Sequence, residues 1–401
     1  MKKVISVNAG SSSLKFQLFD MPSEEVLTSG IAERVGMDMG VFTIKVNGEK
    51  ITKNIPIANH KVAVELLLEA LVEHKIVQSL NEIVGAGHRI VQGGSYFDRS
   101  MIVDDDVVQK VDELAELAPL HNHAHLTGYF AFKEALPQIQ HVFVFDTAFH
   151  QTMEPEVYTY PLPYEWYTDY KVRRYGAHGT SHQYVAFKCA ELMGKDIKDL
   201  KLITCHLGNG ASISAVDGGK CVNTSMGFTP LAGIMMGTRC GDIDPAIVLY
   251  MMNKTGMNTA DMDTALNKKS GMLGITGLSS DARDVDKAAK EGNERAILAQ
   301  RIYANRTVNV IGGYFMQMGR ADAIVFTAGL GENDAFIRKI ICDGLKEGMG
   351  IDLNYVKNET VHSKEELISN ATSKVQVWVI PTNEELVIAR DTYHLLGLGN
   401  D

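Results

Sequence analysis

The chain has 401 residues, 45% of them hydrophobic and 22% charged, and its formal net charge is -10 at pH 7. This length and composition predict two or three domains with sizeable cores rather than a disordered or fibrous protein. The acidic balance argues against binding along a nucleic-acid backbone, which needs a basic face, but it allows a small anionic substrate held by a few local cations.

The cysteines and the apolar runs indicate the compartment. The five cysteines include no CxxC pair, which is typical of reduced structural thiols and not of a disulfide framework or a zinc site. No apolar run reaches the roughly 20 residues of a membrane helix, and the first residues lack the pattern of a signal peptide. We therefore expect a soluble cytoplasmic protein without a membrane or nucleic-acid partner.

The first segment is expected to form a hairpin. Apolar and polar residues alternate over 3–7 and 14–19, on either side of the small-residue turn Asn8–Ser13. Residues 202–216 repeat this pattern around Gly208–Gly210, about half a chain later. We expect an internal duplication, with chance similarity of two hairpins as the alternative.

Helices and strands alternate over the rest of the chain. Apolar residues three and four apart predict helices over 104–117, 181–193 and 294–318. The last of these is expected to be interrupted at Gly312-Gly313. Apolar runs predict strands at 142–145, 323–326 and 375–380. This alternation predicts an α/β protein.

The familiar nucleotide and hydrolase motifs are absent, since the sequence contains no GxxxxGK[ST], GxGxxG, HExxH or GxSxG. A nucleotide would then be held by glycine and serine turns, whose successive N–H groups can bind phosphate. Three such turns follow apolar strands, at Asn8–Ser13, Gly208–Gly210 and Ala328–Asn333. Lys15, which follows the first turn, could meet a phosphate or be a solvated strand lysine.

Three charged residues lie in places typical of a site. Arg89 and Arg239 both lie among glycines, which allow close approach of a ligand. A guanidinium binds carboxylate or phosphate oxygens in pairs, although a surface salt bridge is the alternative for either arginine. Asp146 ends an apolar strand, where α/β sheets carry their sites, or it is a cap.

Histidines offer two candidate metal sites. His178 and His182 are four residues apart and could bind zinc, although no glutamate accompanies them. His121, His123 and His125 could bind a soft metal from a loop.

Glu384 is a candidate ligand of a hard cation. Thr382 and Glu385 match the capping box T-x-x-E at the start of a helical run. This box occupies Glu385 and leaves Glu384 to coordinate Mg²⁺, with a purely capping segment as the alternative.

Together these segments resemble the acetate kinase family, the acetokinase branch of the actin and sugar-kinase fold. The resemblance rests, in order from residue 4 to residue 386, on VNAGSSSLKF, GHRIVQGG, VFDTAFH, RRYGAHGTSH, HLGNGAS, MGTRCGDIDP, SSDARD, TAGLGEN and TNEEL. It implies an α/β fold of two duplicated actin/ribonuclease-H-like domains with a nucleotide-binding cleft between them. The N-terminal domain would take residues 1–150 plus 385–401, closed by the C-terminal helix, and the nucleotide-binding domain would take residues 151–384.

The resemblance also implies roles for single residues. Mg²⁺ (or Mn²⁺) would be held by Asn8 and Glu384. The catalytic residues would be Asp146, His178 and Arg239. The acid would be bound by Arg89, Val91, Leu120, Ala177 and Pro230. ATP or ADP would be bound by Lys15, His206, Leu207, Gly208, Asn209, Gly210, Asp281, Ala282, Arg283, Gly329, Leu330, Gly331, Glu332 and Asn333.

The activity implied is that of an ATP-dependent acetate kinase, which reversibly transfers a phosphoryl group from ATP to acetate, in line and directly, to give acetyl phosphate and ADP. A homodimer is implied as well. The alternatives are a kinase for propionate or another short-chain carboxylic acid, a pyrophosphate-dependent acetate kinase and, from another class, an actin-like ATPase. Arg89 and Arg239 argue against the last, because an ATPase with a conformational output needs no carboxylate pocket.

The chemistry of the acid bears on Asp146. A carboxylic acid with a pKa of about 4–5 is already ionised near neutral pH, so it offers no proton to a general base. We therefore expect Asp146 to organise an arginine or a metal-bound water.

Two positions depart from the family pattern. Ala177 stands where the family usually has phenylalanine, and His123 stands where it usually has proline. The small side chain of Ala177 is expected to loosen acid selection, so that propionate is accepted besides acetate. One methylene in such a pocket decides only about 1–3 kcal/mol.

Overall fold

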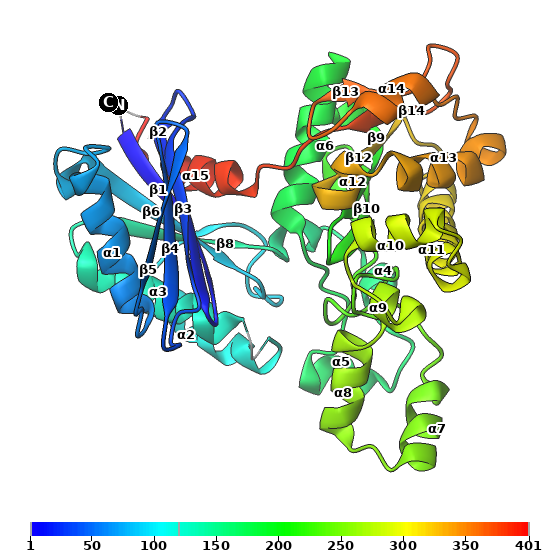
Figure 1. Ribbon diagram of the computed structural model, residues 1–401, viewed down its shortest axis with the longest axis horizontal. Coiled ribbons are helices and arrows are strands. Elements are labelled where there is room, and N and C mark those ends of the chain that lie inside the picture. Colours follow the sequence, from blue (N-terminus) through cyan, green and yellow to red (C-terminus); the bar gives the residue numbers. More distant parts are fainter. Residues whose placement is uncertain (1, 119–120, 400–401) are drawn as a thin grey trace. The chain divides into compact units, whose positions relative to one another are not determined.

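A computed structural model of the protein describes residues 2–118 and 121–399, and the chain divides into two compact units. The first unit combines Met1–Phe149 with Asn383–Asp401, and the second takes His150–Thr382. Each unit has its own sheet and its own hydrophobic core (Figure 1). None of the helices that the structure describes combines the length and the apolar composition needed to pass through a bilayer.

The first unit is a mixed sheet flanked by helices. Its strands are β1 (Lys2–Gly10), β2 (Ser13–Met21), β3 (Glu25–Glu33), β4 (Gly40–Val46), β5 (Glu49–Ile55), β6 (Ile83–Ile90), β7 (Met101–Ile102) and β8 (Gln140–Phe145). Its helices are α1 (His60–Glu73), α2 (Asp105–Glu113), α3 (Asn122–Ala135) and α15 (Glu384–Leu395). The strand order is β5-β4-β3-β2-β1-β6-β8-β7.

The predicted N-terminal hairpin forms the centre of this sheet. β1 and β2 pair antiparallel, with Asn8 opposite Lys15, and β6 and β8 follow beside β1 in parallel. Side chains alternate along a strand, so Val7 and Phe16, a register pair, face the core. Helices α1 and α3 cover that face.

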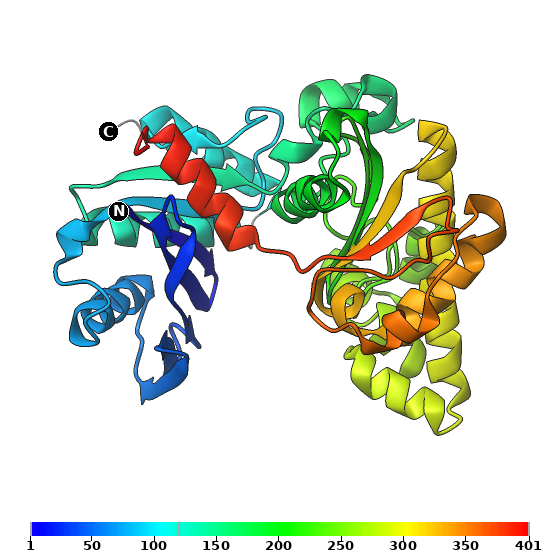
Figure 2. The ribbon, with the colours of Figure 1, turned by 90° about the horizontal axis from the view of Figure 1, so that it is seen from above.

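Helix α15 lies on the opposite face, although it comes from the far end of the chain (Figure 2). It packs against β1, β6 and β8, and two glycines of β6 make room for it. A Cβ atom on Gly87 would lie 2.3 Å from Oγ1 of Thr392, and one on Gly85 would lie 2.7 Å from Cδ1 of Leu396. Both distances are too short for any side chain, so these glycines let the middle and the last turn of α15 pack directly on β6.

The second unit has the same plan with more helices. Its strands are β9 (Lys201–Leu207), β10 (Ala211–Asp217), β11 (Lys220–Thr224), β12 (Ala323–Thr327), β13 (Glu366–Leu367) and β14 (Gln376–Val379). Its helices are α4 (Pro155–Tyr158), α5 (Tyr164–Tyr170), α6 (Gly179–Met193), α7 (Ala246–Thr255), α8 (Thr259–Lys268), α9 (Gly271–Thr276), α10 (Ala282–Lys290), α11 (Glu294–Met318), α12 (Ala328–Asn333), α13 (Ala335–Met349) and α14 (Tyr355–Thr360). Helix α6 packs against β9 and β12, and α11 packs against β9 and β10.

The two sheets share a strand order. The second sheet runs β11-β10-β9-β12-β14-β13, and its first five strands match β3-β2-β1-β6-β8 of the first sheet in order and direction. Each sheet thus has an antiparallel meander followed by two parallel strands. This agreement supports the internal duplication that the two hairpins predicted.

The predicted strands and helices are confirmed, and two local details are wrong. Gly312 and Gly313 do not interrupt α11, because a glycine in a long helix only weakens it and does not break it. Asn383, not Thr382, caps α15, since its side chain accepts a hydrogen bond from the N–H of Leu386 at 3.1 Å. Glu385 is therefore not held in the predicted capping box.

Candidate active site

A buried ion pair joins two parallel strands of the first unit. Arg89 lies on β6, and Asp146 directly follows the neighbouring strand β8. The guanidinium donates from Nε to the two carboxylate oxygens at 2.9 and 3.2 Å and from Nη2 to Oδ2 at 2.6 Å. Asp146 is 1% exposed and Arg89 is 22% exposed.

The charge of Arg89 is secured by this pair. Burial disfavours the charged guanidinium, but the charge and the hydrogen bonds of Asp146 outweigh burial, so the pKa of Arg89 is raised above its usual value. The carboxylate also fixes the direction of the guanidinium, because a two-point contact leaves little rotational freedom. This arrangement agrees with the expectation that Asp146 organises an arginine.

The loop that follows Arg89 is held by polar side chains. The N–H of Gly93 donates to Oγ1 of Thr147 at 3.0 Å. Asn122 is fully buried and donates from Nδ2 to the carbonyl of Gln92 at 3.0 Å. Buried polar groups satisfied in this way keep a loop in one conformation, which is what a binding site on a loop requires.

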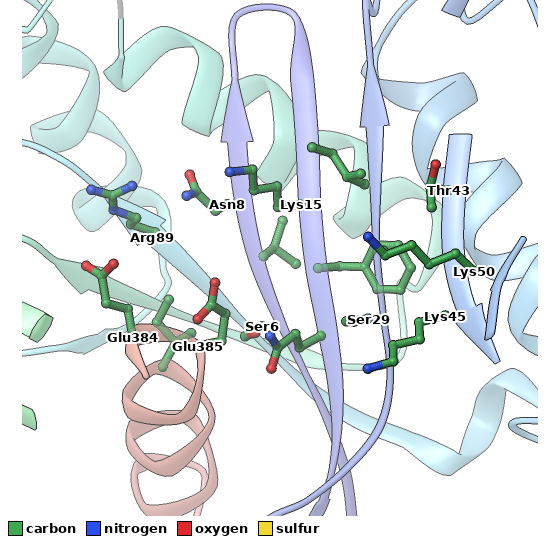
Figure 3. A pocket seen from close by; sticks show the side chains of 16 residues that line it. Ser6, Asn8, Lys15, Ser29, Thr43, Lys45, Lys50, Arg89, Glu384 and Glu385 are labelled. Atoms are coloured by element: carbon green, nitrogen blue, oxygen red, sulfur yellow. The ribbon is translucent and has the colours of Figure 1, made fainter. Parts of the chain in front are cut away.

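A pocket of about 300 Å³ opens beside the ion pair, wholly within the first unit. Its walls include four of the predicted site residues, which Figure 3 labels: Asn8, Lys15, Arg89 and Glu384. Asn8 and Lys15 are direct partners on neighbouring strands. Lys15 is exposed, and its ammonium group has no ion pair or hydrogen bond with the residues that the structure describes.

One end of this pocket has the donor chemistry of a magnesium site. Glu384 and Glu385 form the first turn of α15, and Asn8 lines the same pocket (Figure 3). Burial, with the charge of Glu384 adding to it, raises the pKa of the Glu385 carboxyl. The described residues contain no group of three or more His, Cys, Asp or Glu that could cage a metal. Mg²⁺ needs only one or two carboxylates beside waters and substrate phosphates, so the residues present fit it.

A buried polar network lies beneath α6 in the second unit. His178 precedes this helix and has a left-handed backbone with φ of 58°, a conformation that costs free energy for any residue but glycine. Its Nδ1 lies 2.8 Å from Oγ of Ser212, and Nε2 of His182 lies 2.7 Å from the same oxygen. Nδ1 of His182 lies 2.7 Å from Oγ1 of Thr204. Polar contacts therefore connect the ring of His178 to buried residues in the interior of the unit.

The protons of the rings and of the Ser212 hydroxyl restrict which atoms can donate hydrogen bonds in this network. Burial lowers the pKa of His182 well below its usual value, so its ring is neutral at pH 7. The hydroxyl of Ser212 has one proton and cannot donate to both rings, so at least one histidine N–H donates to it. When His182 donates to Ser212 and Ser212 donates to His178, the proton of a neutral His178 ring lies on Nε2.

The loop between β9 and β10 brings several predicted residues together. A Cβ atom on Gly210 would lie 3.3 Å from Nη1 of Arg239 and 3.7 Å from Nε2 of His178, so glycine leaves space for both groups. The ring of His206 stacks on that of His178 with the centroids 4.0 Å apart. Nδ1 of His206 lies 2.7 Å from Oγ of Ser181. Leu207, in contrast, is fully buried in the core.

Arg239 differs from Arg89 because it has no carboxylate partner among the described residues. Its Nη1 donates to the carbonyl of Pro230 at 3.2 Å. The side chain is half-buried, and burial lowers its pKa below the usual value. A partly desolvated guanidinium without a counter-charge is suited to bind an anion.

A second pocket, of about 910 Å³, lies wholly in the second unit. Its walls bring together predicted nucleotide residues from three separate segments: Gly208, Asn209, Asp281, Ala282, Arg283, Gly329, Leu330 and Asn333. A volume of this size can hold a nucleotide. Asp281 also caps α10, and its hydrogen bonds with the Arg283 side chain lower the pKa of Asp281 to about 2.

Gly331 and Glu332 lie on the short helix α12, which the structure has in place of the predicted turn at Ala328–Asn333. Oε1 of Glu332 accepts hydrogen bonds from the N–H of Ala328 at 2.9 Å and of Thr382 at 3.2 Å. The first of these braces a strained residue, because Ala328 has φ of 62°. The carbonyl of Gly331 accepts from the buried guanidinium of Arg338 at 3.0 Å. Both residues therefore hold α12 in place.

The residues predicted to contact the methyl group of the acid lie in both units. Val91 is partly buried in the first unit, and Pro230 is partly buried in the second. Ala177 is 4% exposed within the core of the second unit, and its carbonyl lies 2.9 Å from Nε2 of His150. Leu120 lies outside the described residues.

The histidines considered as metal ligands have other partners. His182 lies between Ser212 and Thr204. The second group does not lie in a loop as expected, because α3 begins at Asn122. Nδ1 of His125 lies 2.6 Å from the carbonyl of Ala9, where it braces the end of β1.

Sequence reasoning assigned Glu385 to a capping box and missed four residues behind the site: Asn122, Thr147, Thr204 and Ser212. A signal for two of them was present, because Thr204 and Ser212 interrupt the apolar strands β9 and β10. A polar residue inside a buried strand must find a hydrogen-bond partner, so it marks a second polar group that packs on the same face.

Comparisons with known proteins agree with this geometry. The model of the acetokinase family matches residues 3–390. The chain belongs to the acetokinase family. It is 56% identical over 399 residues to a protein named acetate kinase from Geobacillus sp. (strain WCH70), and the match covers 100% of each chain.

Two solved structures extend this finding. A crystal structure of acetate kinase from Porphyromonas gingivalis is 44% identical with a TM-score of 0.95, covering 99% of this chain and 100% of that one. A crystal structure of a propionate kinase from Francisella tularensis is 40% identical with a TM-score of 0.92, covering 98% and 100%. The expected fold class, α/β with two duplicated domains of the acetokinase kind, is confirmed.

Proposed function

We propose that the protein is an acetate kinase that transfers the terminal phosphoryl group of ATP to acetate and gives acetyl phosphate and ADP in a reversible reaction. The observation that carries this proposal is the 56% identity, along the whole chain, to a protein named acetate kinase. The reaction brings a carboxylate to a polyanionic triphosphate, so catalysis depends on positioning and charge neutralisation. An oxygen of the acid bonds to the terminal phosphorus as the bond to the bridging oxygen of ADP breaks.

Arg89 is proposed to bind the carboxylate of the acid. Its two-point contact with Asp146 directs the guanidinium and keeps it charged. Asp146 does not act as a general base, because an acid with a pKa of about 4–5 is already ionised. In this account Asp146 orients Arg89.

Arg239 and His178 are proposed to stabilise the phosphoryl group during transfer. Arg239 has the unbalanced charge for this role, and Nε2 of His178 lies at the same loop. The Ser212 contact at Nδ1 lets His178 carry its proton on Nε2, where it can donate to a phosphoryl oxygen. Donors placed where charge develops are the main source of catalysis in such reactions.

The nucleotide is proposed to bind in the pocket of about 910 Å³ in the second unit. The segments Asp281–Arg283 and Gly329–Asn333 would surround the nucleoside. The phosphates would meet His206–Gly210 and Lys15.

A magnesium or manganese ion is proposed to be held by Asn8 and Glu384. When bound, it supplies positive charge to the phosphate oxygens. Glu385 lines the same pocket and adds a second carboxylate to the charge that attracts the ion.

Acetate is the proposed acid, with propionate accepted as well. Ala177 replaces a larger residue of the family pattern, and the chain is similar to a propionate kinase as well as to acetate kinases. A difference of one methylene is worth about 1–3 kcal/mol in such a pocket, so the preference is a matter of degree.

A homodimer is proposed through the surface of α7. No residue of this apolar helix is buried among the described residues. Leu249 is 67% exposed and Tyr250 is 60% exposed, and α5 exposes Trp166 at 46% and Tyr170 at 69%. Exposed large aromatic and aliphatic side chains are typical of association sites.

The free thiols and the ATP requirement fit the cytoplasm, where we propose that the protein works.

The test is whether release of ADP from ATP depends on the acid. We expect ADP release that requires acetate and that stops when the acid is omitted. ADP release at the same rate without any acid would instead favour the actin-like ATPase. Acetyl phosphate formed from pyrophosphate but not from ATP would favour the pyrophosphate-dependent kinase.

A further inference from the structure

The pocket of the first unit extends beyond the residues proposed for catalysis. On the side away from Glu384 it continues along the polar face of the sheet to β4 and β5, beyond the strands that α15 contacts (Figure 3). We call this part the lysine groove; it is lined by Ser6, Gln17, Ser29, Thr43, Lys45 and Lys50.

Two lysines of the groove face each other without a counter-charge. Lys45 on β4 and Lys50 on β5 are direct partners in the antiparallel register, so their side chains lie on the same face. Both are exposed, and among the described residues neither ammonium group has an ion pair. Like charges directly opposite each other destabilise a strand pair, so an anion bound between them would relieve that repulsion.

Lys15 adds a third unpaired cation at the inner end of the groove (Figure 3). Lys15 on β2 pairs with Ile31 on β3, which pairs with Thr43 on β4. Thr43 is two residues from Lys45 on the same strand, so Lys15 and Lys45 lie on the same face of the sheet. Three cations on one face stand out in a chain whose formal net charge is -10. A local excess of cations attracts anions even where the global charge is negative.

Ser6 provides an independent sign of a ligand. It lines the pocket and is 1% exposed, yet its Oγ has no hydrogen-bond partner. A buried hydroxyl without a partner is costly, and such groups are usually satisfied by a ligand or an ordered water. Ser6 pairs with Gln17 across β1 and β2, so the orphaned hydroxyl belongs to the polar face of the groove.

We propose that the lysine groove is a second anion site, which binds a small phosphate anion such as inorganic pyrophosphate. Ammonium groups and hydroxyls suit the tetrahedral, multiply charged phosphate group, whereas a lone carboxylate is better matched by the guanidinium fork of arginine. The whole pocket, of which the lysine groove is one part, has a volume of about 300 Å³, so the groove suits a small ion rather than a nucleoside. This site goes beyond the proposed phosphoryl transfer and shares only Lys15 with the proposed contacts to the phosphates of ATP.

The test uses the full-length protein and inorganic pyrophosphate at constant ionic strength, followed by isothermal titration calorimetry. The variant is the double substitution Lys45→Gln and Lys50→Gln. The matched control is Lys53→Gln, because Lys53 lies on the same strand but on the other face, where it pairs with Glu73 at 3.1 Å.

We expect saturable binding to the wild type, unchanged binding to the control, and affinity weaker by about tenfold or more in the double variant. The acid-dependent rate without pyrophosphate should be the same in all three proteins. Equal binding by the double variant, or no saturable binding by the wild type, would overturn the proposal.

A second variant separates binding from folding. Lys50→Glu puts an opposite charge across from Lys45, so we expect a protein at least as heat-stable as the wild type that no longer binds pyrophosphate. The titration is repeated with ATP to distinguish free pyrophosphate from the phosphate chain of a nucleotide. A double variant that loses affinity for ATP but not for pyrophosphate would make the groove part of the nucleotide site and would contradict a separate one.

Discussion

Oγ of Ser212 lies 2.8 Å from Nδ1 of His178. This contact fixes the ring of a residue whose other nitrogen faces the Gly210 loop, and it connects that ring to the buried His182. The orientation of the His178 ring is therefore set from inside the second unit.

The first prediction concerns this contact. Ser212→Ala should lower kcat about fivefold with little change in the KM for ATP, because one orienting hydrogen bond is worth about 1 kcal/mol. Steady-state kinetics with ATP and acetate varied in turn measure kcat and both KM values.

Ser214→Ala is the matched control for Ser212→Ala. Ser214 lies on the same strand and face, but its hydroxyl pairs with Thr224 at 2.8 Å and does not touch His178. Equal losses of kcat in the two variants would assign Ser212 a merely structural role.

The second prediction concerns the ion pair of Arg89 and Asp146. Asp146→Asn should abolish most activity and destabilise the protein by about 3–5 kcal/mol, because it leaves a buried guanidinium without its counter-charge. The acidic limb of the wild-type pH profile should persist in the residual activity, since Asp146 transfers no proton. Disappearance of that limb in the variant would show that Asp146 is a general base.

An exposed pair gives the control for Asp146→Asn. Asp98 and Arg99 are 62% and 73% exposed, and Asp98→Asn should change stability by less than about 1 kcal/mol. Urea unfolding of both variants measures the difference.

The third prediction concerns pH and stability. His125 and His141 are buried, and burial lowers the pKa of each to about 4. In the unfolded chain they titrate near 6.5, so below that pH the unfolded state binds protons first. Each neutral buried histidine therefore contributes fully to the free energy of unfolding above about pH 6.5. This contribution is lost as the pH falls towards about 4, by up to roughly 3 kcal/mol for each residue.

His141→Gln should therefore flatten the decline of the urea midpoint between about pH 7 and pH 4.5, because glutamine does not titrate. His394→Gln, which changes an exposed histidine of the same unit, should leave the slope as it is. Circular dichroism is the suitable signal, since both tryptophans, Trp166 and Trp378, lie in the second unit. A slope unaffected by His141→Gln would contradict the assignment.

The fourth prediction concerns the acid. Ala177→Phe should raise the ratio of kcat/KM for acetate over propionate by about tenfold or more, because it restores the larger side chain of the family pattern. Ala177 is 4% exposed, so Ala177→Val is a smaller change that should move the ratio in the same direction. An unchanged ratio in both folded variants would mean that position 177 does not select the acid.

Much of the fold could be predicted because its signals are local. The alternation around Asn8–Ser13 and around Gly208–Gly210 predicted both hairpins, and the spacing of apolar residues predicted the long helix α11. Gly312 was misjudged because a helix that is held by packing tolerates a glycine. The cap of α15 shifted to Asn383 because Thr382 donates its hydroxyl to Ser181, a contact between residues far apart in sequence.

In the candidate site, too, local sequence signals predicted single residues but not the contacts between residues far apart in sequence. Arg89 and Asp146 were each a candidate, but their pairing depends on the parallel register of β6 and β8, which no short motif encodes. The lysine groove was not predicted either, since Lys45 and Lys50 look like solvated residues of a hairpin until the register places them opposite each other. Long-range pairing decides what such residues can do.

The central claim is tested most directly by acyl phosphate formation from ATP and acetate, trapped with hydroxylamine, with the wild type and Arg239→Ala compared. The account predicts abundant acetyl hydroxamate from the wild type, less propionyl hydroxamate, and a kcat lower by about 10²–10⁵ in Arg239→Ala. Arg320→Ala, at an arginine that is 52% exposed, should be as active as the wild type. No hydroxamate from either acid, in a protein that still binds ATP, would contradict the account.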